Sequence, residues 1–240
     1  MKQKIILTII ISIIFLQTNA QRAGIYIGGG FNSSSYSSTP LLNSILDEYN
    51  TTRPWLSKTM DTKMNPMTGL CFNSGIVLGK IFMEFDWVGR NKETYAEGIA
   101  PSSGLMGRRD LKIRANTFNS GIGLMVIPYL GLGLSADFGT VTCFTRTYDN
   151  GTTPPDYTKV FFSDLTAGVS FFAQVMIPIS KSGFSHFVIK PYYQLMIIRS
   201  DYGSLHDDLV GSNVFYTAPD GDLRSNFGFE IKIQLGFGSE

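Results

Sequence analysis

Residues 130–138 read Leu-Gly-Leu-Gly-Leu-Ser-Ala-Asp-Phe, and the pattern of this segment indicates the fold of the whole chain. Its apolar side chains alternate with glycine, serine and aspartate, so that Leu130, Leu132, Leu134 and Phe138 share one face. Strict period 2 is typical of a β-strand with one apolar face. At about 3.3 Å per residue and a tilt of roughly 40°, the strand rises about 20–25 Å, close to the apolar band of a transmembrane barrel.

The same alternation recurs along the chain. It predicts eight strands, over residues 22–32, 70–78, 81–90, 111–126, 130–144, 160–177, 187–199 and 224–238. The connections between them are alternately long and short. A soluble sandwich has no reason to sort its loops by length, whereas an outer-membrane barrel does. We therefore predict an all-β fold: an eight-stranded antiparallel up-and-down transmembrane β-barrel with long extracellular loops and short periplasmic turns.

Local signals refine this prediction. The apolar parity switches across Gly79-Lys80, which indicates a two-residue turn with Leu78 opposite Ile81. The parity also changes within 111–126, so we expect a β-bulge near Asn116–Thr117. In the long segment 33–68, apolar residues at helical spacing behind Pro40 predict a short helix.

Composition and the N-terminus indicate where the protein is located. The chain has 240 residues, a formal net charge of +1 and 16% charged residues, so it carries no nucleic-acid footprint. Lys2 and Lys4 precede an apolar run over 5–16, and Thr18-Asn19-Ala20 offers a small-residue cleavage site. We expect residues 1–20 to be a cleaved signal peptide and residues 21–240 to form one barrel domain in the outer membrane.

Three features of the sequence support a resemblance to a known family: the glycines of the first strand (Gly24, Gly28, Gly29 and Gly30), the Gly79-Lys80 hairpin and a last strand that ends near Phe237. On these features the chain resembles the small outer-membrane β-barrel family of Gram-negative bacteria. The members of this family are the eight-stranded OmpA- and OmpX-like, porin-like proteins. Family members commonly end on an aromatic residue that the insertion machinery reads, whereas three residues follow Phe237 here. The resemblance implies an architecture and does not imply an activity.

The lumen of an eight-stranded barrel is filled by side chains, so inward charges must be paired or hydrated. Strand phase points these residues inward: Glu84, Asp86, Asp137, Asp164, Lys190, Glu230 and Lys232. It predicts lipid contact for these residues: Leu130, Leu132, Leu134, Phe138, Phe229, Ile231, Ile233 and Leu235. We interpret the inward charges as a salt-bridge network that closes the lumen; a gated narrow pore is the alternative.

The chemistry-bearing residues do not indicate an enzyme. Ser204, His206 and Asp207 are neighbours in one loop, which is not the arrangement of a catalytic triad, and adding Asp208 gives only a weak metal pattern. We predict no cofactor and no metal. Cys71 and Cys143 fall on strands too far apart for a disulfide, so two free buried thiols are expected.

These features predict a non-enzymatic surface or structural role. The long loops would contact an extracellular or periplasmic protein partner, and outer-membrane lipid would surround the barrel. The candidate contact residues are Leu41, Leu42, Ile45 and Trp55 in the first long loop. The alternative interpretation, held equally, is that this loop is a lid folded onto the rim of the barrel. The alternatives are a narrow channel or secretion-complex barrel and, more remotely, a lipid-modifying enzyme.

Overall fold

The computed structural model describes residues 23–36, 40–63, 65–101, 104–149, 151–162, 165–180, 185–198, 202–211 and 225–239. The expected signal peptide and Asp164 lie outside these described residues.

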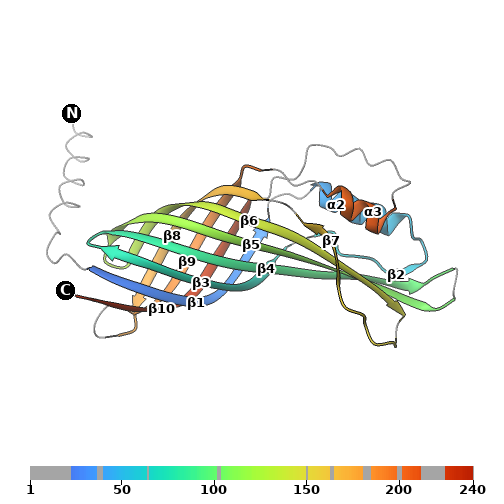
Figure 1. Ribbon diagram of the computed structural model, residues 1–240, viewed down its shortest axis with the longest axis horizontal. Helices are drawn as coiled ribbons and strands as arrows, with labels where there is room; N and C mark the ends of the chain where they lie inside the picture. Colours follow the sequence, from blue (N-terminus) through green and yellow to red (C-terminus); the bar gives the residue numbers. More distant parts are fainter. Residues whose placement is uncertain are drawn as a thin grey trace.

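Eight antiparallel strands close into a barrel (Figure 1). Around the ring they are β1 (Ala23–Tyr36), β3 (Met67–Leu78), β4 (Ile81–Ile99), β5 (Met106–Ile127), β6 (Leu130–Asp149), β8 (Thr166–Pro178), β9 (His186–Met196) and β10 (Asn226–Ser239). β10 pairs back onto β1 along the full length of both strands, so the ring has no open edge. The predicted eight-stranded antiparallel barrel is confirmed.

Short turns lie at the end of the barrel where β1 begins and β10 ends. At Gly79 the backbone has φ +61, and Leu78 pairs with Ile81, which confirms the predicted two-residue turn. The outer surface above these turns is a belt of exposed apolar side chains. Its members include Ile25, Leu70, Phe85, Phe118, Ile122, Phe171 and Phe227. Neither helix in the described residues is long and apolar enough to cross a bilayer.

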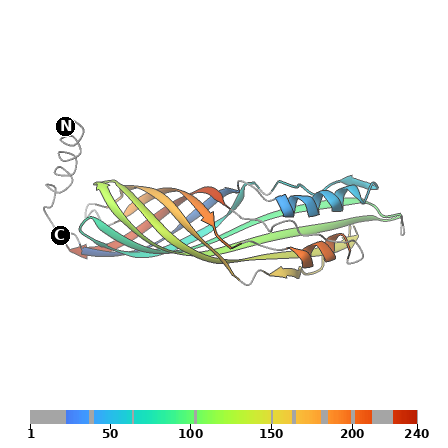
Figure 2. The ribbon, with the colours of Figure 1, turned by 90° about the horizontal axis from the view of Figure 1, so that it is seen from above.

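Three neighbouring strands continue far beyond the rim. β4, β5 and β6 have 19, 22 and 20 residues, whereas the other five barrel strands have 11 to 14. Two short strands widen this projection, since β2 (Leu56–Lys58) pairs with β4 and β7 (Thr158–Phe162) pairs with β6. Helices α2 (Pro40–Thr51) and α3 (Gly203–Leu209) lie against its inner face (Figures 1 and 2).

We call this projection the platform: β2, β7, α2, α3 and residues 89–99, 106–116 and 140–149 of the three long strands. Helix α2 confirms the helix predicted in the first long loop. Its buried side chains, Leu41, Leu42, Ile45, Leu46 and Tyr49, recur every three to four residues and form one apolar face.

The structure corrects the phase prediction for residues 111–126. Pairing runs without a shift through Asn116 and Thr117 on both sides of β5, so the predicted bulge is wrong. Leu111 and Ile113 instead point to the inner face and are buried beneath the helices. The apolar phase changes because the apolar side chains lie outside in the barrel and inside in the platform.

Two further strand predictions are corrected. The segment predicted as one strand over 160–177 is divided into β7 and β8, and β7 pairs with β6 outside the barrel ring. The segment 91–110, expected to be a long connection, instead includes the paired ends of β4 and β5, over residues 91–99 and 106–110. Its side chains lack an apolar alternation because the outer face of the platform is charged.

Candidate functional site

The lower lumen is closed by two aromatic rings. Phe82 and Phe172 lie with ring centroids 6.1 Å apart. They occupy the space beside glycines of β5 and β6: a Cβ at Gly123 would lie 2.1 Å from Phe82 Cζ, and one at Gly133 would lie 2.4 Å from Phe172 Cζ. The Leu-Gly-Leu-Gly alternation thus has a physical cause, since leucine covers the outside while glycine leaves room for a ring inside.

A buried charge cluster lies near these rings. Lys190 donates to Glu84 and Asp86, and its Nζ lies 4.2 Å from the centroid of the Phe172 ring. Lys232 Nζ donates to Asp86 Oδ1 at 3.0 Å and lies 2.8 Å from Glu230 Oε2. All five side chains are nearly inaccessible to solvent. Carboxylates and ammonium groups therefore alternate across the lumen and compensate one another.

Asp137 is held differently from the other inward carboxylates. Among the described residues, the groups that donate hydrogen bonds to it are neutral: Ser135 Oγ donates at 2.7 Å, Gln194 Nε2 donates at 2.8 Å, and Ser170 Oγ also donates. The structure thus brings five of the seven predicted charges into one cluster, buries Asp137 apart from them and does not describe Asp164.

Sequence reasoning missed a buried arginine near the top of the lumen. Arg90 Nε donates to Asn32 Oδ1 at 3.0 Å, Nη1 to Thr117 Oγ1 at 3.2 Å, and Nη2 to the Tyr192 hydroxyl at 3.0 Å. Arg90 lies on the same face of its strand as Glu84, and this alternation could have identified Arg90 as an inward residue. A cavity of about 20 Å³ adjoins Arg90 and is roughly large enough for one water molecule.

The residues predicted to meet lipid all lie on outward positions of β6 and β10. The accessible fractions of Leu132, Leu134 and Ile233 are 49%, 51% and 53%, whereas Leu130 beside the turn is half-buried. The other four, Phe138, Phe229, Ile231 and Leu235, are also exposed.

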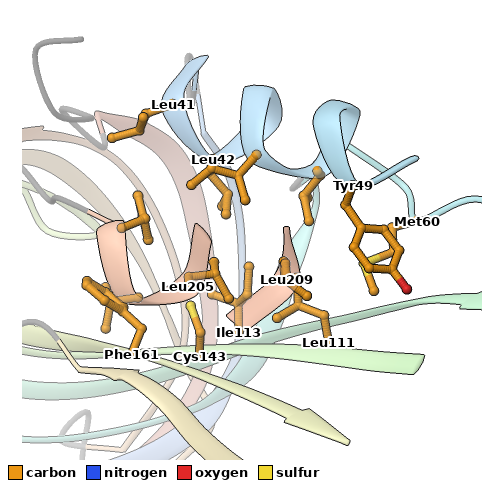
Figure 3. Close-up of a cluster of buried hydrophobic side chains, with 14 of the residues drawn as sticks. Leu41, Leu42, Tyr49, Met60, Leu111, Ile113, Cys143, Phe161, Leu205 and Leu209 are labelled. Carbon is orange, nitrogen blue, oxygen red and sulfur yellow. The ribbon is translucent and has the colours of Figure 1, made fainter. Parts of the chain in front are cut away.

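The platform has an apolar core of its own, formed between its helices and its strands (Figure 3). Leu42, Leu205 and Leu209 of the helices meet Ile113 and Cys143 of the strands, together with these buried residues: Leu41, Ile45, Leu46, Tyr49, Met60, Ala96, Leu111, Ala115, Val141, Phe161 and Tyr202. Helices and sheet therefore form one packed unit outside the barrel.

Polar contacts fix the position of α3 in this unit. Arg109 Nη2 donates to the carboxylate and the carbonyl of Asp208 at 2.6 and 2.8 Å, and Thr145 donates to the same carboxylate at 2.9 Å. Arg53 donates to the Leu209 carbonyl at 2.8 Å. The two helices are thus tied both to the sheet and to each other.

The predicted contact surface of the first long loop is corrected. Leu41, Leu42 and Ile45 are buried at 1%, 2% and 1% exposure, because the apolar face of α2 turns onto the platform core. These three side chains are not available to an outside partner, and the alternative reading of a segment folded over the rim describes them better. Trp55, beside β2, is half-buried.

The weak catalytic and metal patterns are not assembled. His206 is buried, with Nε2 3.3 Å from Glu48 Oε2 and Nδ1 3.8 Å from Asp207 Oδ1, while Ser204 is exposed. Asp208 is engaged by Arg109. Within the described ranges, no three His, Cys, Asp or Glu side chains are placed to hold a metal ion.

Both cysteines are buried and neither is part of a disulfide, as expected from strand spacing. Cys71 lies on β3 and Cys143 in the platform core.

No protein-family model matches the chain, and no curated protein matches it. Among solved structures it is similar to Ail, the attachment invasion locus protein of Yersinia pestis, in complex with the heparin analogue sucrose octasulfate (9% identity, 91% of this chain and 100% of that chain, TM-score 0.40). It is also similar to the outer membrane protein OprG from Pseudomonas aeruginosa (11%, 92% and 99%, 0.38) and to Neisserial surface protein A (9%, 89% and 95%, 0.37). The barrel fold of this chain rests on its own strand pairing.

Proposed function

We propose that the protein is an integral outer-membrane β-barrel that acts at the cell surface through its platform. Two opposed surfaces support the membrane location. The outside of the barrel is a belt of exposed apolar side chains, whereas the inside carries buried ionic groups such as Lys190 and Lys232. A membrane reverses the usual placement of apolar and polar residues in this way, and a closed barrel leaves no unpaired strand edge in lipid.

A barrel with a closed lumen is favoured over a channel. Three layers of side chains follow one another along the lumen: the Phe82–Phe172 pair, the charge cluster, and Arg90 with its hydrogen-bond partners. Each layer is held by side chains from several strands, so opening a path requires several ion pairs and hydrogen bonds to separate together. We infer a non-enzymatic protein, with a narrow channel as the alternative function.

The platform core is the observation that carries the surface role. Strands β4, β5 and β6 extend ten residues or so beyond the level at which β8 begins, and they bury the apolar faces of α2 and α3. A merely structural barrel needs no packed unit above its rim. A preorganised surface of this kind presents side chains in fixed positions, which lowers the ordering cost of binding a partner.

Reconstitution into planar bilayers tests this proposal. The purified protein, shown to be folded by a heat-dependent change in its gel mobility, should give no conductance steps. Reproducible steps would favour the channel alternative. A protein that shows one mobility with and without heating and stays in buffer without detergent would refute the membrane barrel itself.

A further inference from the structure

The outer face of the platform carries cations that lie over aromatic rings. The Arg108 guanidinium carbon is 3.7 Å from the centroid of the Tyr95 ring, and that of Arg146 is 4.2 Å from the centroid of Tyr157. Lys58 Nζ lies 3.7 Å from the Tyr95 centroid. Lys112 lies over Tyr157 at 5.6 Å, and Arg114 over Phe144 at 5.4 Å. We call Lys58, Tyr95, Arg108, Lys112, Arg114, Phe144, Arg146, Tyr148 and Tyr157 the cation–aromatic ladder.

A buried carboxylate organises the centre of the ladder. Asp110 accepts hydrogen bonds from Arg108 Nε at 2.7 Å, Arg146 Nε at 2.8 Å and the Tyr148 hydroxyl at 3.3 Å. Burial by itself raises the pKa of Asp110, but the bonds from the two arginines outweigh it and hold the pKa below its ordinary value. Asp110 is therefore a fixed anion that positions both guanidinium groups.

This arrangement leaves the Nη groups of both arginines without a hydrogen-bond acceptor among the described residues. In the contacts of the described residues, Arg108 and Arg146 use only Nε, while each guanidinium also carries two Nη groups. The two Nη groups of an arginine can donate hydrogen bonds to two oxygens of one phosphate. Arg114 is exposed, and no carboxylate of the described residues lies within ion-pair distance of it.

The charge of this face favours an anionic ligand. The outward positions of β2, β4, β5 and β6 in the platform hold five cations, Lys58, Arg108, Lys112, Arg114 and Arg146, and three carboxylates, Glu93, Glu97 and Asp110, which gives these positions a net charge of +2. The whole chain has a net charge of only +1. A positive surface is thus concentrated on one side of the platform.

Position along the strands indicates the source of the ligand. Phe118 and Phe138 face each other at the top of the apolar belt, and Arg114 follows on the same face of β5, four residues beyond Phe118. Four residues at about 3.3 Å, on a strand tilted about 40°, place Arg114 about 10 Å above the belt. The same arithmetic places Arg108 about 25 Å above it. The ladder therefore rises from the lipid surface through a layer thicker than a simple phosphodiester headgroup.

We propose that the cation–aromatic ladder binds the phosphorylated saccharide headgroup of a lipid in the leaflet around the barrel. The cations bind its phosphates, and the rings of Tyr95, Phe144 and Tyr157 pack on the C–H faces of its sugars. This assignment rests on the membrane insertion and orientation proposed above. It deepens the surface role by naming a ligand that would fix the platform upright on the membrane.

Binding of diphosphoryl lipid A by the full-length protein in neutral mixed micelles tests the proposal. We expect tighter binding of this lipid than of phosphatidylglycerol. Arg114→Gln should raise its apparent dissociation constant about three- to tenfold, since one partly exposed charged contact is lost. Lys80→Gln at the opposite end of the barrel removes one charge as a matched control and should leave the constant unchanged. All variants are first shown to keep the heat-dependent mobility of the folded barrel.

Three outcomes would overturn the proposal. The first is equal binding of lipid A and phosphatidylglycerol, and the second is an equal effect of Arg114→Gln and Lys80→Gln. The third is equally tight binding of the deacylated bisphosphorylated disaccharide, which would assign the ladder to a soluble anion. Failure of membrane insertion is a separate result, because it would be seen in the gel mobility before any lipid is added.

Discussion

The buried charge cluster allows one quantitative prediction for Lys190→Met. The cluster contains three carboxylates and two ammonium groups, Glu84, Asp86, Glu230, Lys190 and Lys232, for a net charge of −1. Methionine is close to lysine in length, so it fills most of the same space beside Phe172 without supplying a charge. The substitution leaves a net charge of −2. It also removes the two hydrogen bonds that Lys190 of β9 donates to Glu84 and Asp86.

The expected loss is about 3–5 kcal/mol of unfolding free energy, the usual cost of removing one partner of a buried ion pair. It is measured by urea unfolding of the barrel in lipid vesicles, followed by tryptophan fluorescence. The double variant Lys190→Met with Glu84→Gln restores the net charge of −1 and should recover about half of the loss or more, on the same reasoning. A single variant within about 1 kcal/mol of wild type, or a double variant no better than the single one, would show that charge compensation does not hold the lumen closed.

Three other predictions concern the belt, the platform core and the outer face. Leu134→Arg should cost about 2–4 kcal/mol of barrel stability in vesicles, whereas Ser135→Asn, one residue on but inside, should cost much less; the reverse order would mean that the facing is inverted. Leu46→Ala, at a fully buried site of α2, should cost about 2–5 kcal/mol locally, seen as faster proteolysis of the platform with unchanged heat-dependent mobility of the barrel. Asp110→Asn should reduce protease resistance of the platform at neutral pH. Folding lowers the pKa of Asp110, so the stability that its carboxylate contributes is present above about pH 4 and is lost as the pH falls through the folded pKa. The difference in protease resistance between variant and wild type should therefore shrink in acid.

The barrel was predictable from sequence because each strand meets two solvents. Lipid outside and a polar lumen inside impose period 2, and this alternation marked the strands and the turn at Gly79. The glycines of the opening stretch also had the correct face. The reason for these glycines was not predictable, since it depends on Phe82 and Phe172, side chains of other strands whose rings occupy the space beside the glycines.

The platform was only partly predictable. Helix α2 has an apolar stripe that identified it, but nothing local indicated that Leu41, Leu42 and Ile45 share one core with Leu111 and Ile113 from another part of the chain. The change of apolar phase in β5 was the available signal, and it was interpreted as a bulge. Helix α3 has seven residues and a single apolar pair at helical spacing, too little to distinguish it from a loop.

Labelling of introduced cysteines in intact cells tests whether the barrel spans the outer membrane with its platform on the cell surface. Both native thiols are buried, so the background should be low. Thr152→Cys lies in an exposed turn beside the platform, and Lys80→Cys lies in the two-residue turn at the other end of the barrel. A membrane-impermeant maleimide should modify Thr152→Cys in intact cells and Lys80→Cys only after the outer membrane is permeabilised. Modification of Lys80→Cys in intact cells, or of neither site until permeabilisation, would contradict a barrel that spans the outer membrane with its platform on the cell surface.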